Sequence, residues 1–309
     1  MKAIFIIGQT ASGKSQFAID VAKKINGIII NCDSIQFYEP LKIGSAAPTI
    51  DDFATVQHYL YSYVKPPTEM TAGQFLRDFY ELINSDDFMI KNKSRTLIIV
   101  GGTGFYIQAL EKGMYNIPPV SENLKKEIEH EILEFGNQKA YKELIEFDPD
   151  SKIHVNDSYR LGRALEIKRS FNLKISEIQK HLELDTKFKL PFDYLKIGVE
   201  IEKENLIKNI QTRTRYMLNN GIIDETQNLI NLGFQDWAPL GSVGYYEVKE
   251  FLNGRIDQSD LESRICTSTL QLTKKQKTWF KRDTKTMWLN PEISSDQKSI
   301  LEKIEKLIK

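Results

Sequence analysis

The stretch Gly8-Gln9-Thr10-Ala11-Ser12-Gly13-Lys14-Ser15 decides the fold of this chain. It matches the pattern G-x-x-x-x-G-K-[ST] at every fixed position. An apolar run at residues 3–7 precedes it and a helical pattern at residues 15–25 follows it, which is the context that the pattern requires. There the glycines let backbone N–H groups surround a phosphate, and the helix N-terminus adds its positive dipole end. The stretch is therefore predicted to bind a diphosphate or triphosphate, with Lys14 at the terminal phosphate and the Ser15 hydroxyl as a Mg²⁺ ligand.

Apolar runs and helical patterns alternate through the first third of the chain, which predicts a parallel sheet built from crossover units. The expected elements are strands at residues 28–30, 59–64 and 96–100 and a helix at residues 71–83. Gly101, Gly102 and Gly104 follow the third of these strands at once. They predict a second glycine turn that leads into a helix.

The middle of the chain departs from this alternation. Residues 121–181 show charged amphipathic helical patterns without a convincing strand, so they are expected to form a helical insertion. The later elements are strands at 194–201 and 286–289, helices at 203–232 (divided near Gly221) and 257–282, and an amphipathic tail helix. The predicted fold class is α/β, a P-loop NTPase-like parallel sheet core flanked by helices, with an α-helical insertion domain. The expected domains are 1–117, the first part of the P-loop core; 118–190, the helical insertion; and 191–309, the core continuation with C-terminal helices.

Length and composition limit the class of protein. With 309 residues, 41% of them hydrophobic, the chain has material for one large or two ordinary domains and is not expected to be disordered. Cys32 and Cys266 lack metal-ligand or redox spacing, so they are expected to be reduced thiols of a cytoplasmic protein. The apolar run near the N-terminus is too short for a signal sequence or a membrane span, so no membrane partner is expected.

The charge balance is neutral in sum but uneven along the chain. There are 42 Lys and Arg residues and 42 Asp and Glu residues. Residues 263–289 nevertheless hold seven basic residues and one acid, a local charge of +6. The zero total taken alone argues against nucleic acid as a partner, whereas the local excess predicts an RNA-binding face in the second half of the chain.

Asp33 is the first candidate for chemistry outside the phosphate loop. It follows the strand at 28–30, so it is expected at the same carboxyl edge of the sheet as that loop, where ligands of open α/β sheets bind. A carboxylate there can bind Mg²⁺, cap a helix or act as a general base, and position alone leaves these three open. Ser34, Gln36 and Tyr38 lie close behind and suit recognition of a flat polar ligand. The strand at 96–100 ends without an acid, which disfavours ordinary ATP hydrolysis.

Further motifs make the chain resemble the tRNA dimethylallyltransferase (tRNA isopentenyltransferase) family, bacterial type. The phosphate loop fits the family form G-x-T-A-S-G-K-S. The other shared motifs are D-S-x-Q-x-Y at 33–38, I-G-S-A-x-P-T at 43–49, G-G-T-G-x-Y at 101–106, N-D-x-Y-R-L-x-R-A-L-E at 156–166, R-x-x-x-M-L from Arg213, V-G-Y at 243–245 and Q-x-T-W-F at 276–280. They occur in family order over nearly the whole chain, which makes the set far more specific than the phosphate loop alone.

The resemblance implies transfer of a dimethylallyl group from dimethylallyl diphosphate to N6 of the adenine just 3′ of the anticodon (A37), in tRNAs reading codons that start with U. The phosphate loop then holds a diphosphate leaving group, which accounts for the missing hydrolytic acid. Mg²⁺ is the implied cofactor, and Arg213 is expected to help Lys14 neutralise the charge that develops as the allylic C–O bond breaks. Asp33 is expected to accept the N6 proton. Thr10 and Thr103 are similar to family positions that contact the reacting substrates.

The implied partner is the anticodon stem-loop of tRNA, whose adenine must leave the stacked loop to be reached. The positions expected to bind it are Asp33, Ser34, Ile35, Gln36, Thr103, Lys125, Tyr159, Arg160, Leu161, Gly162, Arg163, Lys274 and Lys275. For Arg160 and Arg163, spacing alone leaves a solvated helix face as the plain alternative. The protein is expected to be a monomer.

The chain also departs from the family pattern. Ala47, Tyr246 and Leu270 stand where the family usually carries a basic residue, and Gly241 stands where some members carry Arg. Each missing phosphate contact should weaken RNA binding and flatten its salt dependence.

Three other functions remain open at this stage. A small-molecule P-loop kinase shares the loop but does not explain the D-S-x-Q cluster or the helix with Trp279. An isopentenyltransferase acting on free adenine nucleotides is usually shorter and lacks an insertion of this size. A catalytically inactive RNA-binding paralogue would lose Asp33 and keep the basic residues, which is the reverse of this sequence.

Overall fold

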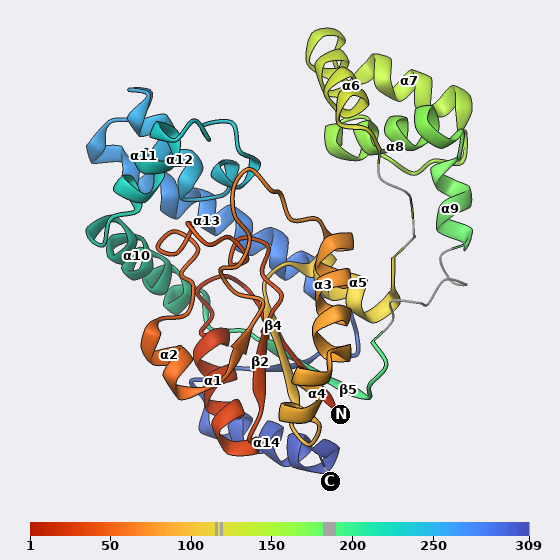
Figure 1. Ribbon diagram of the computed structural model, residues 1–309. Coiled ribbons are helices and arrows are strands. Elements are labelled where there is room, and N and C mark those ends of the chain that lie inside the picture. Colours follow the sequence, from red (N-terminus) through yellow and green to blue (C-terminus); the bar gives the residue numbers. More distant parts are fainter. Residues whose placement is uncertain (115–116, 118–119, 182–189, 309) are drawn as a thin grey trace. The chain divides into compact units, whose positions relative to one another are not determined.

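The computed structural model describes residues 1–308 except 115–116, 118–119 and 182–189 (Figure 1). It divides into two compact units. The P-loop unit comprises Met1–Gln108 and Pro191–Lys309, and the helical unit comprises Ala109–Leu190. From the sequence, the helical insertion was expected to begin at residue 118 and to end at residue 190. The first division instead falls inside one helix, α5 (Gly104–Lys112).

Among the described residues of the P-loop unit, six parallel strands form one sheet in the order β3-β2-β4-β1-β5-β6. The strands are β1 (Ala3–Gly8), β2 (Ile28–Asn31), β3 (His58–Tyr59), β4 (Leu97–Gly101), β5 (Tyr194–Val199) and β6 (Met287–Leu289). β1 pairs with β4 and β5 on its two sides, which places the phosphate loop at the middle of the sheet. The predicted α/β fold with a parallel sheet is confirmed.

The predicted strand at 59–64 is wrong in extent. Only His58 and Tyr59 pair with β2, and Val64 forms an isolated bridge with Tyr38. Leu60 and Ser62 take positive φ angles of 59° and 50°, which turn the chain out of the extended conformation.

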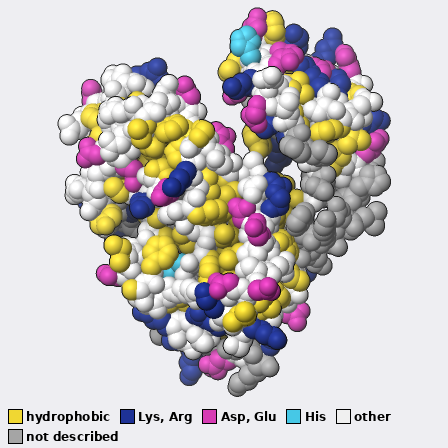
Figure 2. Space-filling model, in the orientation of Figure 1, with side chains coloured by type: hydrophobic (Ala, Val, Ile, Leu, Met, Phe, Trp, Pro, Cys, Tyr) yellow, Lys and Arg dark blue, Asp and Glu magenta, His cyan; other side chains and the backbone are white. Residues whose placement is uncertain are grey.

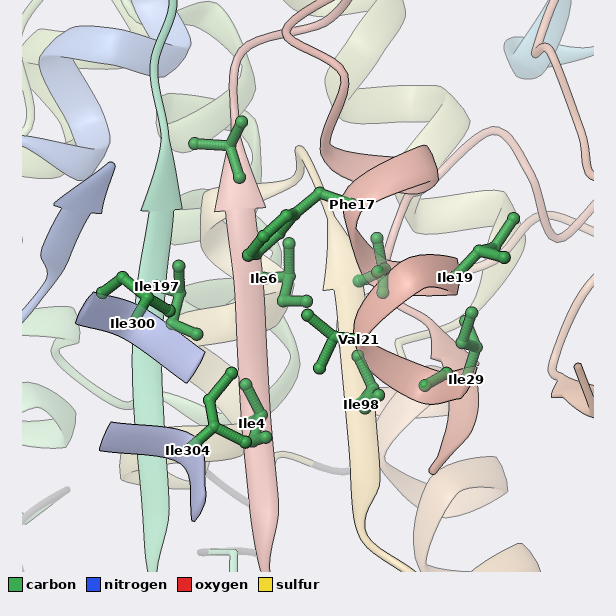
Figure 3. Close-up of a cluster of buried hydrophobic side chains, with 14 of the residues drawn as sticks. Ile4, Ile6, Phe17, Ile19, Val21, Ile29, Ile98, Ile197, Ile300 and Ile304 are labelled. Atoms are coloured by element: carbon green, nitrogen blue, oxygen red, sulfur yellow. The ribbon is translucent and has the colours of Figure 1, made fainter. Parts of the chain in front are cut away.

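One part of the core of this unit lies between the sheet and helices on one of its faces. In Figure 3, Phe17 and Val21 of α1 (Lys14–Ile25) and Ile300 and Ile304 of α14 (Ser294–Ile308) lie over the strands. Alternate strand residues such as Ile4 and Ile6 face these helices. The residues between them are also fully buried, so both faces of the sheet are covered, as the continuous apolar strands predict.

The remaining helices of the P-loop unit surround the carboxyl edge and sides of the sheet. They are α2 (Ile50–Thr55), α3 (Ala72–Asn84), α4 (Asp86–Asn92), α10 (Lys203–Asn219), α11 (Ile222–Asn231), the 3₁₀ turn η1 (Ala238–Gly241), α12 (Tyr245–Leu252) and α13 (Gln258–Phe280). The short helices α2, α4 and α12 were not expected from the sequence. A local signal for α2 exists, because Thr49 and Asp52 form a reciprocal capping box.

The helical unit consists of α6 (Glu122–Phe135), α7 (Asn137–Phe147), α8 (Ser158–Phe171) and α9 (Ile175–His181). Its apolar core contains Ile128, Leu144 and Leu161. Arg169 on α8 holds the first two helices together, because its guanidinium pairs with Glu131 at 2.8 Å and with Glu143 at 2.9 Å. In the part of the chain that the structure describes, no helix has the length and apolar character of a membrane span.

Candidate active site

Three loops meet at the carboxyl edge of the sheet. They follow β1, β4 and β2, and β4 lies between the other two strands. The first is the phosphate loop, the second begins at Gly102, and the third runs from Cys32 to Gln36. Gly101 allows the last two to approach, because a Cβ there would lie 2.0 Å from the Cys32 carbonyl oxygen. The sheet thus brings Lys14 and Asp33 to one edge, as their positions after strands predicted, and the turn after β4 brings Thr103 to the same edge.

The phosphate loop owes its shape to its glycines. A Cβ on Gly8 would lie 2.5 Å from the Val199 carbonyl oxygen of β5, and Gly13, which starts α1, has a left-handed φ of 84°. The Ser12 hydroxyl is 1% exposed and has no hydrogen-bond partner among the described residues. Because an unsatisfied buried hydroxyl costs about 1–3 kcal/mol, the loop is suited to a ligand that supplies hydrogen bonds.

Lys14 carries a charge into this loop. Its side chain is 8% exposed, and its ammonium donates to the Gln9 carbonyl oxygen at 3.4 Å. Burial lowers the pKa of Lys14 to about 8, while nearby Asp33 raises it and Arg213 lowers it further. A buried ammonium with such a pKa is stabilised by an anion, which is what a phosphate supplies.

Asp33 is held by its own loop. The Asn31 side chain accepts the Asp33 N–H at 2.8 Å, and Asp33 Oδ1 accepts the Ile35 N–H at 3.2 Å. No helix starts here, so the helix-capping role is wrong. Within the described residues Asp33 Oδ2 has no hydrogen bond. A Cβ on Gly102 would lie 3.4 Å from this oxygen, so glycine keeps its surroundings open.

Thr103 joins the loops after β4 and β2. Its hydroxyl accepts the Ser34 N–H at 3.0 Å and donates to the Ser34 hydroxyl at 3.2 Å. Its carbonyl oxygen accepts the N–H of Tyr106 at 3.0 Å, which begins α5. Thr103 therefore fixes the Asp33 loop relative to β4.

Helix α13 supplies a residue that the sequence did not single out for the site. Gln276 accepts the Thr10 N–H at 2.8 Å and donates to the Gly102 carbonyl oxygen at 3.1 Å, so one amide connects both glycine loops. A Cβ on Gly104 would lie 2.1 Å from Trp279 Cδ1. The sequence does contain a signal for the close approach of α13, because Gly102 and Gly104 have no side chains and leave room for that helix. Only the tertiary structure shows that Gln276 and Trp279 occupy this room.

Arg213 and Gln36 are connected through the backbone of the loop that contains Ser45. The Arg213 guanidinium, on α10, donates to the Ser45 carbonyl oxygen at 3.3 Å. The Gln36 amide donates to the same oxygen at 3.1 Å and to the Ala46 carbonyl oxygen at 2.8 Å. Burial lowers the pKa of Arg213, against the raising effects of Asp33 and Tyr245. Asp33 thus acts electrostatically on both Lys14 and Arg213, which indicates a single site.

The residues predicted on α8 and α6 belong to the helical unit. Tyr159 is 83% exposed, whereas Leu161 is fully buried, so its side chain cannot contact a ligand at the surface. Arg160 pairs with Asp157 at 3.3 Å, and Arg163 with Glu166 at 2.5 Å. A Cβ on Gly162 would lie 3.6 Å from the side chain of Ile132 on α6. Lys125 pairs with Glu122 at 2.5 Å.

Tertiary pairing changes the charge count of residues 263–289. Lys274 and Lys275 are exposed on α13, but Lys277 and Lys281 both pair with Glu200, at 2.5 and 2.7 Å. Glu200 thus offsets part of the positive charge of this segment, whereas its one acid, Asp283, pairs with Lys196. On the face drawn in Figure 2, side chains of both signs are interspersed.

One departure from the family pattern has a packing reason. Leu270 lies against a buried cluster of Ile201, Leu206 and Ile210 between α10 and α13. Ala11 of the phosphate loop packs on the same cluster. An apolar side chain at position 270 therefore stabilises the apolar cluster on which the phosphate loop packs. A basic side chain at this position would have to extend beyond the cluster to keep its charge in water.

A parallel sheet with a glycine-rich phosphate loop after its central strand defines a P-loop α/β protein. The model of the IPP transferase family matches residues 36–283. The chain is 43% identical over 290 residues to a tRNA dimethylallyltransferase of Bdellovibrio bacteriovorus, covering 93% of this chain and 92% of that protein. It is 35% identical over 309 residues to a tRNA dimethylallyltransferase of Synechocystis, covering 99% and 95%. The chain belongs to the IPP transferase family, as its motifs predicted.

Three solved structures of tRNA prenyl-transferring enzymes are similar to this chain over nearly its whole length. A tRNA isopentenylpyrophosphate transferase from Bacillus halodurans matches with a TM-score of 0.71 and 26% identity, over 99% of this chain and 96% of that one. The corresponding enzyme from Staphylococcus epidermidis matches with a TM-score of 0.67 and 32% identity, over 99% of both chains. A eukaryotic dimethylallyltransferase acting on tRNA matches with a TM-score of 0.77 and 25% identity, over 98% of this chain and 78% of that one.

Proposed function

We propose that this protein transfers a dimethylallyl group from dimethylallyl diphosphate to N6 of adenine 37 in tRNAs reading codons that start with U, giving N6-isopentenyladenosine. Relatives that cover nearly the whole chain bear the name tRNA dimethylallyltransferase. The observation that carries the proposal is the meeting of two loops at the carboxyl edge: Gln276 joins Thr10 of the phosphate loop to Gly102, and Asp33 Oδ2 lies 3.4 Å from a Cβ placed on Gly102. Two cations suit a diphosphate, and a carboxylate that acts on both of them suits an amine that must lose a proton.

The diphosphate is proposed to lie in the phosphate loop. The unpartnered Ser12 hydroxyl and the N–H groups at the start of α1 offer hydrogen bonds to its oxygens. Lys14 and Arg213 neutralise the negative charge that moves onto the leaving diphosphate as the bond between C1 and oxygen breaks. Because Lys14 is buried and Arg213 is half-buried, little reorganisation of water is needed at that moment.

The acceptor adenine is proposed to lie beside Asp33. N6 forms a bond to C1 of the dimethylallyl group, and the N6 proton passes to Asp33 Oδ2, the carboxylate oxygen without a hydrogen bond among the described residues. Asp33 then holds one proton, and the diphosphate leaves with the electron pair of the broken bond. The Gln36 amide and the Ser34 hydroxyl suit hydrogen bonding to the base edge.

Mg²⁺ fits the site only together with a diphosphate. The described residues contain no cluster of three or more His, Cys, Asp or Glu side chains suited to a metal. Mg²⁺ commonly takes one or two protein oxygens and completes its shell with phosphates and water, and the exposed Ser15 hydroxyl is such an oxygen. When bound, the metal would supply additional positive charge to the diphosphate.

Binding of tRNA is proposed to involve Tyr159, Arg160, Arg163 and Lys125 of the helical unit and Lys274 and Lys275 of α13. The exposed Tyr159 ring can stack on an unpaired base, and the basic residues suit phosphates. Their present ion pairs with Asp157, Glu166 and Glu122 would have to open or be shared.

The direct test is incubation of the protein with Mg²⁺, dimethylallyl diphosphate and an anticodon stem-loop containing A36-A37-A38, followed by mass analysis of the RNA. We expect one added dimethylallyl group at A37 and none when A37 is replaced by G. Transfer to AMP but not to the stem-loop would favour a free-nucleotide enzyme. Phosphate release from ATP, without prenyl transfer, would favour the kinase.

A further inference from the structure

The loop at residues 42–46 is held from outside by two side chains. On α11, the Glu225 carboxylate accepts hydrogen bonds from the N–H groups of Lys42 at 2.9 Å, Ile43 at 3.0 Å and Gly44 at 3.2 Å. On α12, the buried Tyr245 hydroxyl donates to Glu225 at 2.5 Å. Three consecutive backbone N–H groups thus end on one carboxylate, which itself accepts the Tyr245 hydroxyl.

The same pair determines the path of the loop. Tyr245 is fully buried, and a Cβ on Gly44 would lie 2.5 Å from its Cζ, so glycine is needed there. Ala46 takes a left-handed φ of 49°. That conformation costs a residue with a Cβ about 1–2 kcal/mol and persists only where the surroundings impose it. Burial, followed by the charge of Glu225, raises the pKa of Tyr245, so its hydroxyl remains a donor to the carboxylate.

The opposite side of the loop faces the active site. Its Ser45 carbonyl oxygen accepts from both the Arg213 guanidinium and the Gln36 amide. Gln36 also donates to the Ala46 carbonyl oxygen. One peptide carbonyl therefore orients a residue of the proposed diphosphate side and a residue of the proposed adenine side.

We infer that Glu225 and Tyr245 are positioning residues for the transfer reaction, acting through the Ser45 carbonyl on Arg213 and Gln36. This inference rests on the proposed function. Neither residue reaches the reacting atoms in the contacts described. Arg213 has no ion pair among the described residues, so its direction depends on this carbonyl. A displacement of about 1 Å in such a group can slow a reaction by about 100-fold.

The test is a double-mutant cycle between Glu225→Gln and Arg213→Ala, read by single-turnover transfer to the stem-loop. We expect Glu225→Gln to slow transfer by about 10-fold to 100-fold. The double variant should be no more than about 2-fold slower than Arg213→Ala alone, because the effect of Glu225 passes through Arg213. Asp224→Asn, an exposed acid one residue away on the same helix, is the matched control and should keep the wild-type rate.

A wild-type rate in Glu225→Gln, or a double variant whose loss is the product of the two single losses, overturns the inference. If Glu225→Gln does not give the wild-type circular dichroism spectrum, Tyr245→Phe takes its place in the cycle. It removes one donor to Glu225 and should slow transfer by about 3-fold to 10-fold, again without adding to Arg213→Ala.

Failure of the proposed function gives a different result. In that case the wild-type protein transfers nothing to the stem-loop. The cycle is then read by calorimetric binding of dimethylallyl diphosphate without RNA. Glu225→Gln should weaken that binding when Arg213 is present and leave it unchanged in the Arg213→Ala background. Equal weakening in both backgrounds overturns the inference.

Discussion

The basic residues of the helical unit and those of the phosphate-loop site differ in their pairing. In the helical unit, the Arg169 guanidinium is bound by two glutamates, and Arg160 and Arg163 each have an acid within one helical turn. In the P-loop unit, Lys14 and Arg213 have no ion pair among the described residues, and both suffer desolvation. A charge that is paired contributes to structure, whereas a buried charge that is unpaired is available to a ligand. The comparison favours a ligand-binding role for Lys14 and Arg213 in the P-loop unit.

The largest effect is expected at Asp33. Asp33→Ala removes the carboxylate that accepts the N6 proton, so transfer should fall by about 1,000-fold or more. Binding of the stem-loop, measured by filter binding or calorimetry, should remain within a few-fold of wild type. Asp20→Asn changes an exposed acid on α1 and serves as the control. A retained transfer rate in Asp33→Ala would remove Asp33 from the role of base.

Arg213 is expected to come next. Arg213→Ala should slow transfer by about 100-fold, because the developing charge on the diphosphate loses a desolvated cation. It should weaken stem-loop binding much less. Arg215→Ala is the control, since Arg215 pairs with Glu262 at 2.8 Å on the surface. The opposite ranking, with RNA binding affected more than transfer, would make Arg213 an RNA contact.

The buried ammonium of Lys14 should make the affinity for dimethylallyl diphosphate depend on pH, with an effect of intermediate size. With a pKa of about 8 in the unliganded protein, Lys14 loses its proton as the pH rises through 8. Affinity for dimethylallyl diphosphate, measured by calorimetry without RNA, should then fall by up to about 10-fold per pH unit above 8. Lys14→Met should bind weakly with a flat profile over this range. An equally steep profile in Lys14→Met would assign the titration to another group.

The stability of the unliganded protein should rise with pH over the range in which its affinity for dimethylallyl diphosphate falls. The pKa of Lys14 is lower in the folded chain than its ordinary value of 10.5. Between about pH 8 and 10.5 the unfolded chain binds one more proton at this residue, so stability relative to Lys14→Met rises with pH. Chemical denaturation of both proteins at pH 7.5 and 9.5 measures the difference. A difference that shrinks with pH would contradict the shift.

The smallest effect is expected in the helical unit. Arg160→Ala and Arg163→Ala each remove one candidate phosphate ligand that already pairs with an acid. We expect each to change stem-loop affinity by only about 2-fold to 5-fold, and to lower the slope of log K against log salt by about 0.7 for each phosphate that is no longer neutralised. A salt slope unchanged in both variants would place these arginines on a solvated face away from RNA.

How much could be predicted depended on the range of the interactions involved. The phosphate loop and Asp33 were found because each follows a strand directly, and a parallel sheet brings such positions together. Thr103 was found only through its likeness to a family position. The strand at 59–64 was overestimated because the turn at Leu60 and Ser62 opposes an apolar pattern that otherwise suits a strand. Leu161 was grouped with surface residues of a motif, although helical periodicity places it on the buried face of α8.

The sequence by itself determined the parallel sheet, the phosphate loop and the family, because these depend on local patterns and on an ordered set of motifs. Only the tertiary structure decided that Gln276 connects the two glycine loops and that Glu225 and Tyr245 hold the loop beside Arg213. Glu225 and Ile43 are about 180 positions apart in the sequence, and Gln276 and Thr10 are about 270 positions apart. The charge on α13 was likewise lowered by Glu200 at the end of β5. Hydrogen bonds and ion pairs of this kind leave no periodic trace in a sequence, because each depends on one side chain at one point in space.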